Sequence, residues 1–415
     1  MRSNATASPD AATRSAGPWR LVAVIWLGYV LNYVDRQVAF SIFPVLRQEL
    51  GFSSSQLGLL GSLFIWTYSL VNLFSGRLAD VMRRETVMTA GLVLWSAAAL
   101  GTATSQAPVQ FLLWRVCMGV TEAAYVPSAV SLIGTAHPGA TRSRALALYA
   151  TGQMVGIAAG GWFGGWMVSA IGWRTGYVLL ASIGFAFAPL FRRALGTRPA
   201  ADRGEAAVSG QEGVLRSRCY LALAIAFLLM CALLWMVYAW LPEFLFRRYG
   251  LTLAQAGLTA TAYTQAGSVA GLLAGGYLAD RWSRRFGPAR FYIAGIGVAL
   301  CAPCAALTFS GPDLPLLKLY SAGFGFCSAL MAGNIFAAAY DVIPANRYGM
   351  GGGVLNMIGG LSGGAAMFAA GYWPAVGAEG FTRYVAGAAF LAALTLLVVA
   401  RRQFDPDRRR AGLPA

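Results

Sequence analysis

The sequence predicts an all-α polytopic membrane protein of twelve transmembrane helices, arranged as two pseudo-symmetric bundles of six. Three observations indicate this fold class. Of 415 residues, 57% are hydrophobic and only 12% are charged, whereas soluble domains average about 25% charged residues. Twelve apolar stretches have the length of a membrane span, and landmarks of the first half of the chain recur in the second. A chain this apolar needs lipid as its solvent.

Each apolar stretch approaches the roughly 20 residues that a membrane-spanning helix needs. In the first half the expected spans are 19–46, 56–78, 86–105, 108–133, 143–170 and 173–191. In the second half they are 219–246, 253–279, 289–309, 313–342, 348–372 and 381–400. The 50 glycines favour close packing of these helices, because small residues let helix backbones approach each other in lipid.

Polar segments divide the chain into domains. The expected order is a disordered cytoplasmic N-terminus (1–18), a first bundle (19–191), a cytoplasmic linker (192–218), a second bundle (219–400) and a cytoplasmic tail (401–415). The linker is the longest charged interruption, and such a polar stretch cannot cross the hydrocarbon core of a bilayer.

The net charge of +16 raises the question of a nucleic-acid partner, but the distribution of the charge indicates membrane topology. The side that holds both termini collects 24 Lys and Arg residues, and the opposite side collects 6. Cytoplasmic loops carry this excess in membrane proteins. We therefore expect a multi-pass protein of the cell inner (plasma) membrane, with cytoplasmic termini, lipid as a partner and no nucleic acid.

The two halves repeat. Gly51, Gln56 and Gly58 recur 199 residues later, at Gly250, Gln255 and Gly257. The pentapeptide Gly-x-Leu-Ala-Asp at 76–80 recurs 200 residues later, at 276–280, and is followed there by Arg-Trp-Ser-Arg-Arg. Parallel repeats of this kind are typical of one large transporter architecture.

These pentapeptides resemble the signature of the major facilitator superfamily, which lies between its helices 2 and 3 and again in the second half. The resemblance implies two six-helix bundles and a gating motif on the cytoplasmic side. Its residues here would be Gly76, Asp80, Arg84, Gly276, Asp280, Arg281, Arg284 and Arg285. The first copy departs from the signature at Val81 and Arg83, where arginine and glycine are usual. A role of these charges only in stopping translocation is the alternative.

Four ionisable residues lie deep inside predicted spans of the first half, where a charge costs at least about 2.5–3.5 kcal/mol. Asp35 and Arg36 lie deep in the first span, and Arg115 and Glu122 lie in the fourth. Spacings of four and three place Arg115, Gly119 and Glu122 on one helix face. We expect these charges to share a water-accessible chamber between the two bundles. A purely architectural charge network is the alternative.

The patterns Asn-Tyr-x-Asp-Arg at 32–36 and Arg-x-x-x-Gly-x-x-Glu-Ala at 115–123 resemble the anion:cation symporter and spinster-like families within the superfamily. The resemblance implies that Asp35 pairs with Arg115 as a structural charge pair and that Arg36 contacts an anionic substrate. It also implies that Glu122, together with Asp35, carries the coupled proton.

Tyrosines and amides at a similar depth are further candidates for substrate binding, with ordinary helix–helix hydrogen bonding as the alternative reading. They are Tyr33, Tyr68, Tyr125, Gln153, Tyr263, Gln265, Asn334 and Asn356.

The leading hypothesis is a secondary active transporter that moves a small organic anion, a carboxylate or sugar acid, by proton symport and alternating access. Its partners would be a small molecule and protons, and the chain would be a monomer without cofactor or metal. Spinster-like lipid transport and drug efflux by proton antiport are the alternatives within transport. The single histidine argues against a histidine-based metal site or catalytic triad, and the absence of a phosphate-binding Gly-x-x-x-x-Gly-Lys motif argues against coupling to ATP within this chain. Without convergent catalytic groups, an integral-membrane enzyme is the least favoured alternative. A receptor or channel is disfavoured by the repeat and the lack of a pore-like filter.

Overall fold

The computed structural model describes residues 17–81, 83–137, 141–196, 214, 216–344, 347–373 and 376–413, with the side chains of 73–81, 143 and 349 excepted. All regular secondary structure in these ranges is helical. The helices are α1 Pro18–Ser41, α2 Phe43–Leu50, α3 Ser54–Val81, α4 Arg84–Ala103, α5 Pro108–Glu122, α6 Tyr125–Ala136, α7 Arg142–Ala170, α8 Trp173–Leu195, α9 Arg218–Tyr249, α10 Leu253–Ser283, α11 Ala289–Thr308, α12 Leu314–Ala332, α13 Ile335–Tyr340, α14 Tyr348–Tyr372 and α15 Gly377–Arg410.

Twelve helical units cross the molecule, in agreement with the prediction, when α1 is taken with α2, α5 with α6, and α12 with α13. Eight of these units in the described ranges are long and apolar enough to span a membrane. The other four are α1, α3, α7 and α10, with 24 to 31 residues each. Polar residues and glycines lower the hydropathy of α1, α7 and α10. Each of the four helices packs against the opposite half of the chain, so protein replaces part of the surrounding lipid.

The fourth and tenth units are interrupted at corresponding places. In the fourth, α5 ends at Glu122 and α6 begins at Tyr125. Pro127 has no N–H to donate to the carbonyl of Ala123, so the helical hydrogen-bond ladder is broken at that turn. In the tenth, the interruption falls at Gly333 and Asn334. The helix break therefore places Glu122 at the end of α5, in the interior of the first bundle.

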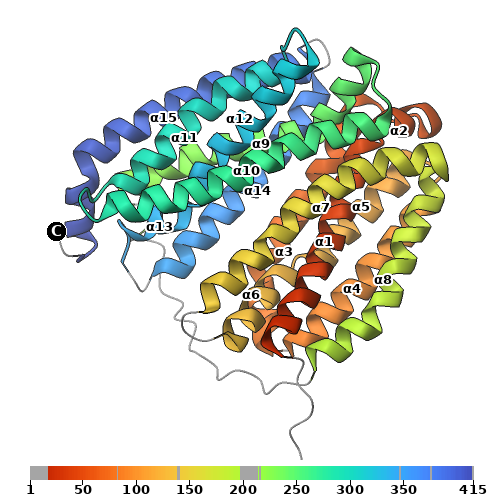
Figure 1. Cartoon of the computed structure of the whole chain (residues 1–415), viewed down its shortest axis with the longest axis horizontal. Helices are drawn as coiled ribbons and strands as arrows, with labels where there is room; N and C mark the ends of the chain where they lie inside the picture. Colours follow the sequence, from red (N-terminus) through yellow and green to blue (C-terminus); the bar gives the residue numbers. More distant parts are fainter. Residues whose placement is uncertain are drawn as a thin grey trace, which may run out of the picture.

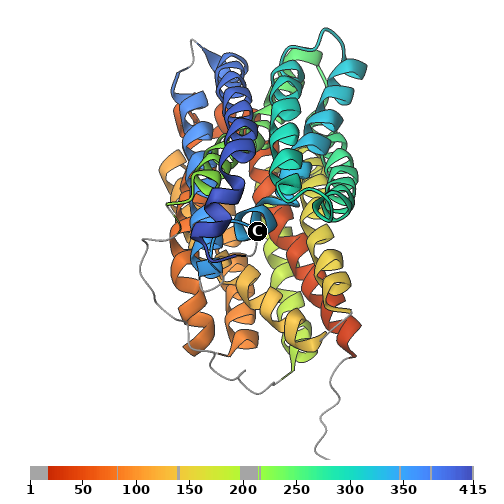
Figure 2. The same ribbon diagram turned by 90° about the vertical axis from the view of Figure 1, so that its left-hand side faces the viewer.

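The two halves form separate groups of helices. In Figure 1, α1–α8 (red to yellow-green) and α9–α15 (green to blue) lie close together near α2 and diverge toward the end that carries both termini. Seen from the side of the C-terminus, the second-half helices lie above those of the first half (Figure 2). We call the end near α2 the α2 end and the other the terminal end. Most of the predicted N-terminal segment and linker lies outside the described residues.

Two helix pairs form most of the seam between the halves: α3 with α14, and α7 with α10. On α3, Ser62 Oγ donates to the Gly364 carbonyl at 2.6 Å, and Trp66 Nε1 donates to the Leu361 carbonyl at 3.1 Å. Between α7 and α10 the backbones nearly touch, because a Cβ atom at Gly257 would collide with the carbonyl oxygen of Gly161. The recurring glycines thus serve close approach of the two halves.

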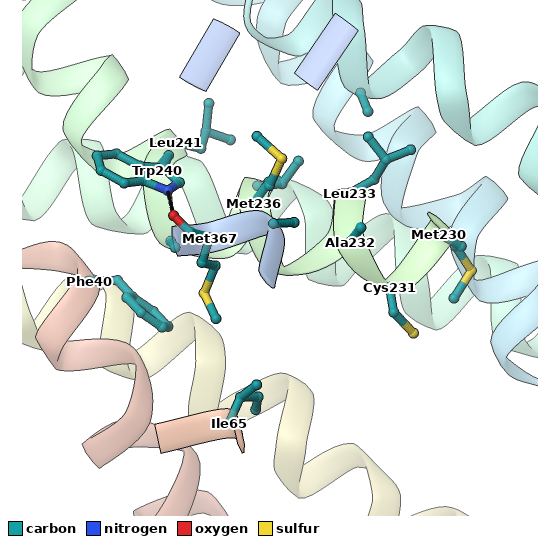
Figure 3. Close-up of a cluster of buried hydrophobic side chains, with 14 of the residues drawn as sticks. Phe40, Ile65, Met230, Cys231, Ala232, Leu233, Met236, Trp240, Leu241 and Met367 are labelled. Carbon is teal, nitrogen blue, oxygen red and sulfur yellow. Dashed lines mark hydrogen bonds between the residues drawn. The ribbon is translucent and has the colours of Figure 1, made fainter. Parts of the chain in front are cut away.

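The main hydrophobic core also crosses the seam. Figure 3 shows Phe40 and Ile65 of the first half facing Met367 of α14, whose carbonyl accepts a hydrogen bond of 3.3 Å from Trp240 Nε1. In contrast, large apolar side chains on the outer helices are exposed, such as Leu391 of α15, which is 65% accessible. An apolar surface of this kind is compatible with lipid and not with water.

Candidate functional site

Besides Glu85 at the start of α4, four charged side chains are buried in the described part of the first half. Asp35 and Arg36 lie on α1 and are each 4% exposed, whereas Arg115 and Glu122 lie on α5 and are fully buried. The structure therefore brings together the four ionisable residues that the sequence singled out. It differs from the expectation in one respect, because Arg36 and Glu122 are enclosed by protein in this conformation instead of lining an open chamber.

A direct ion pair joins α1 to α5. Arg36 Nε donates to Glu122 Oε2 at 2.7 Å, with both side chains almost fully buried. A charge-assisted hydrogen bond of this length is among the strong ones. Removing one partner of such a pair would leave the other charge buried and unpaired, which costs roughly 3–5 kcal/mol.

Three aromatic rings surround the guanidinium of Arg36, and we call them the aromatic cage. Its Cζ lies 4.6 Å from the ring centroid of Tyr33, 4.5 Å from that of Tyr68 and 4.9 Å from that of Phe64. Rings at this distance attract a cation through their negative faces. Tyr68 is the least buried of the three. Since rings cover the faces of the guanidinium, its remaining donors point outward in its own plane.

Phe64 also contacts the second buried cation. The Arg115 guanidinium lies 4.7 Å from the Phe64 centroid, so one ring is shared by Arg36 and Arg115. The sequence analysis missed this residue. A phenylalanine is ordinary in a membrane span, and the only signal was its position one helical turn before Tyr68.

The pairing of Asp35 with Arg115 that the resemblance implied is not formed as a direct ion pair in the described residues. Arg115 Nη1 instead lies 3.7 Å from Met118 Sδ. Asp35 still interacts electrostatically with both Arg115 and Glu122. The ion pair of the cluster is therefore between Arg36 and Glu122.

Several polar atoms of the cluster are buried without a hydrogen-bond partner in the described part of the chain. They are Arg36 Nη2, Glu122 Oε1, Asp35 Oδ1, Arg115 Nε and Nη2, and both amide atoms of Asn32. Each unsatisfied buried polar atom typically destabilises the fold by about 1–3 kcal/mol. Their concentration at one place therefore favours a functional role for this cluster. Asn32 was not among the predicted site residues. It lies one turn before Arg36 on α1 and close to Glu122.

Two other first-half candidates make helix–helix contacts. The Tyr125 hydroxyl donates to the Ile25 carbonyl at 2.7 Å, and Gln153 Oε1 accepts from the Tyr29 hydroxyl at 3.4 Å. Both contacts join α1 to a neighbouring helix, as the alternative reading expected.

In the second half, Gln265 Nε2 donates to the Tyr238 hydroxyl at 2.9 Å, and the carbonyl of Tyr238 accepts from Gln37 of α1 at 3.2 Å. Asn334 Nδ2 donates to the carbonyls of Gly275 and Leu330 at 3.2 and 2.9 Å. Gln265 therefore belongs to a connection across the seam, whereas Asn334 joins helices of one half.

Two second-half candidates are exposed. Tyr263 is 39% exposed and lies under the ammonium of Lys318, 5.3 Å from its ring centroid. Asn356 is exposed on α14. No hydrogen bond, ion pair or ring contact joins either residue to the charged cluster in the described part of the chain, so their role in substrate binding stays a prediction.

The gating-motif residues are divided between the halves. Gly76 and Asp80 lie on α3 where side chains are not described, and Arg84 begins α4. In the second half, Gly276 lies on α10, and Asp280, Arg281, Arg284 and Arg285 line a hollow of about 550 Å³ with Tyr277 and Trp282. A gating function for them stays a prediction.

One carboxyl group just beyond a membrane span has a shifted pKa. Asp341 follows α13 at the terminal end, where partial burial raises its pKa above the usual range. Arg290 of α11 opposes that shift, because its Nη1 donates to both carboxylate oxygens at 2.9 Å. The pair ties α11 to α13.

Paired six-helix bundles joined along a seam, with buried charges beside it, define a polytopic membrane transporter. The family model of the Major Facilitator Superfamily matches residues 25–367 and 223–413, and the chain belongs to this superfamily.

The chain is similar to transporters with different descriptions. An "MFS-type efflux pump" of Mycolicibacterium smegmatis is 26% identical over 335 residues, 79% of this chain and 78% of the relative. The hexuronate transporter of Escherichia coli K12 is 22% identical over 363 residues, 82% and 83% of the two chains. Among solved structures, a bacterial homologue of the human lysosomal transporter Spinster, inward-facing and unoccupied, has a TM-score of 0.75 at 19% identity. That alignment covers 96% of this chain and 100% of the other.

Proposed function

We propose that this transporter moves a small organic anion, a carboxylate or sugar acid, together with protons by symport. The observation that carries the proposal is the buried Arg36–Glu122 pair, in which Nε of the guanidinium is engaged and the buried Nη2 has no partner in the described residues. A guanidinium edge matches a carboxylate in geometry and charge.

Competition for Arg36 provides the coupling. A substrate carboxylate that binds the guanidinium edge brings a second negative charge next to Glu122. Protonation of Glu122 removes its own charge and releases Nε, so proton binding and anion binding favour each other. Such coupling is reciprocal by thermodynamic necessity. Asp35, which lacks an ion pair in the described residues, is the second proposed proton carrier, and Arg115 balances its charge.

Alternating access would open this cluster first to one side of the membrane and then to the other, by rocking of the two halves around it. In this conformation the halves are tied at the α2 end, where Arg47 Nη2 lies 3.1 Å from Glu243 Oε1. At the terminal end the helix ribbons diverge (Figure 1). With the excess of Lys and Arg on the side of the termini, the proposed topology has cytoplasmic termini in the inner membrane. We propose that the chain works as a monomer.

Proton-driven efflux is the second candidate, because one relative over most of the chain is described as an efflux pump. The same residues would serve it if substrate and proton bound Glu122 alternately, in antiport. The two modes predict opposite responses to a pH gradient, since a symported anion accumulates on the alkaline side and an antiported substrate on the acidic side.

The test is transport by the purified chain in liposomes, with D-glucuronate as the first probe. Wild-type protein is expected to accumulate it when the outside is acidic. Arg36→Ala should weaken substrate binding about 10- to 100-fold, because a hydrogen bond to a charged group contributes about 1.5–3 kcal/mol. Glu122→Gln should abolish accumulation driven by pH while preserving exchange of labelled for unlabelled substrate.

The matched control is Arg174→Ala, which removes a half-exposed ion pair with Glu49 inside the first half and should leave transport unchanged. Uptake of organic acids that is unaffected by Arg36→Ala would refute the substrate role of Arg36. Retention of pH-driven accumulation in Glu122→Gln would remove Glu122 from the proton path.

A further inference from the structure

A hollow lies at the terminal end of α10, outside the charged cluster. It has a volume of about 550 Å³ and is lined by Tyr277, Asp280, Arg281, Trp282, Arg284 and Arg285. The chain turns sharply here, because the backbone N–H groups of residues 285 and 286 both donate to the Trp282 carbonyl at 3.0 Å. The turn packs beside α15, because a Cβ atom at Gly287 would collide with the ring of Phe404.

The hollow is strongly cationic. Arg281, Arg284 and Arg285 are all exposed, and none of them forms an ion pair within the described part of the chain. Asp280 is the single carboxylate in its lining. The contrast with nearby Arg290 is clear, since Arg290 is neutralised by Asp341. Three guanidinium groups in five residues therefore present unpaired donors suited to phosphate oxygens.

An apolar and aromatic stripe leads into the hollow along α10. Leu273 is 70% exposed, Tyr277 67% and Trp282 50%. Leu273, Tyr277 and Arg281 are spaced by four residues and so lie on one helix face. At 1.5 Å per residue, the face changes from aliphatic to aromatic to cationic within about 12 Å. This order matches one bilayer leaflet, with acyl chains, then the interface that Trp and Tyr prefer, then phosphates.

We propose that this hollow binds the headgroup phosphate of an anionic phospholipid, with an acyl chain along Leu273 and Tyr277. Charge alone would suit any phosphate, but the exposed stripe leading to the arginines selects a lipid. The site is separate from Arg36 and Glu122. The proposal therefore does not depend on which substrate the transporter carries. Each basic residue near an anionic membrane surface contributes about five-fold in binding, and the three together are expected to contribute about 100-fold.

Native mass spectrometry of the full-length protein, titrated with dioleoyl phosphatidylglycerol, tests the proposal. Replacing Arg281, Arg284 and Arg285 by glutamine should weaken this binding about 100-fold. The matched control replaces Arg401, Arg402 and Arg409 of α15 by glutamine, which removes the same three charges from exposed positions at the same end. The control should retain the affinity, and dioleoyl phosphatidylcholine should bind both variants equally weakly.

Two further measurements distinguish binding of a lipid from binding of a soluble anion and from a folding defect. Trp282→Ala keeps all three arginines. It should weaken phosphatidylglycerol binding several-fold and leave the binding of glycerol phosphate unchanged. Equal loss of lipid in both triple variants would overturn the proposal, because it would show a general effect of net charge. Binding of inorganic phosphate as tight as that of the lipid would also overturn it, in favour of a soluble-anion site.

Discussion

Replacing Arg47 by alanine removes the ion pair that joins the two halves at the α2 end. Arg47 lies on α2 and donates through Nη2 to Glu243 Oε1 of α9 at 3.1 Å, and through Nη1 to Ser54 Oγ at 3.0 Å. Glu243 keeps a second partner on its own helix, Arg247, at 2.6 Å. The substitution therefore removes the contact between halves without leaving Glu243 unpaired.

The size of the effect follows from burial. The side chain of Arg47 is 29% exposed and that of Glu243 is 5% exposed. Exposed pairs contribute about 0–1 kcal/mol, whereas breaking a buried pair costs about 3–5 kcal/mol. With Glu243 still paired, we expect about 1–2 kcal/mol, which corresponds to a five- to thirty-fold shift in population. The shift should favour the conformation in which α2 and α9 are apart.

Distances between spin labels at Gln48 and Arg248, both exposed at the α2 end, measure this population by double electron–electron resonance. Arg47→Ala should increase the long-distance component, and the exchange Arg47→Glu with Glu243→Arg should reverse the increase. Arg174→Ala is the control, because its pair with Glu49 at 2.9 Å lies within one half. Identical distance distributions for Arg47→Ala and wild type would refute the reasoning, as would an equal change in Arg174→Ala.

Two further perturbations test the site and the fold. Phe64→Leu removes the ring shared by Arg36 and Arg115. It should raise the KM for a transported anion by up to about 30-fold, since a desolvated cation–π contact contributes about 2 kcal/mol. An unchanged KM in liposome uptake would contradict this role. Asp407→Ala removes the carboxylate that accepts from the Cys219 N–H at 2.8 Å and from Ser217 Oγ at 2.9 Å. Thermal unfolding should shift down by several degrees in Asp407→Ala and not in Asp405→Ala, whose side chain is exposed.

Much of the architecture could be predicted because lipid imposes simple requirements on sequence. Span length and the 199-residue repeat indicated twelve helices in two halves, and the cost of burying charge identified Asp35, Arg36, Arg115 and Glu122. The helix that contains the last expected span is longer than the span, since α15 begins at Gly377 and continues to Arg410. Its polar extension is held by Asp407, which accepts hydrogen bonds at the start of α9, and hydropathy does not report such a contact.

The partners within the site could not be predicted in the same way. Helix periodicity placed Arg115 and Glu122 on one face of a continuous helix, but which charges meet depends on the rotation of α1 against α5. α5 ends at Glu122, which makes the 2.7 Å contact with Arg36, whereas the resemblance had implied a pair between Asp35 and Arg115. Two residues of the aromatic cage, Phe64 and Tyr68, lie on α3, and no short-range pattern links a phenylalanine on one helix to an arginine on another.

The two sides of α3 have different neighbours, and this has a mechanical consequence. On one side of α3, the Phe64 ring contacts both buried cations, Arg36 and Arg115. On the other side, Ser62 and Trp66 donate hydrogen bonds to backbone carbonyls of α14. A sliding movement of the second half would pull on α3 and displace the ring that spaces Arg36 from Arg115. Through α3, a movement of the second half would therefore change the electrostatic interactions between the buried charges of the first half.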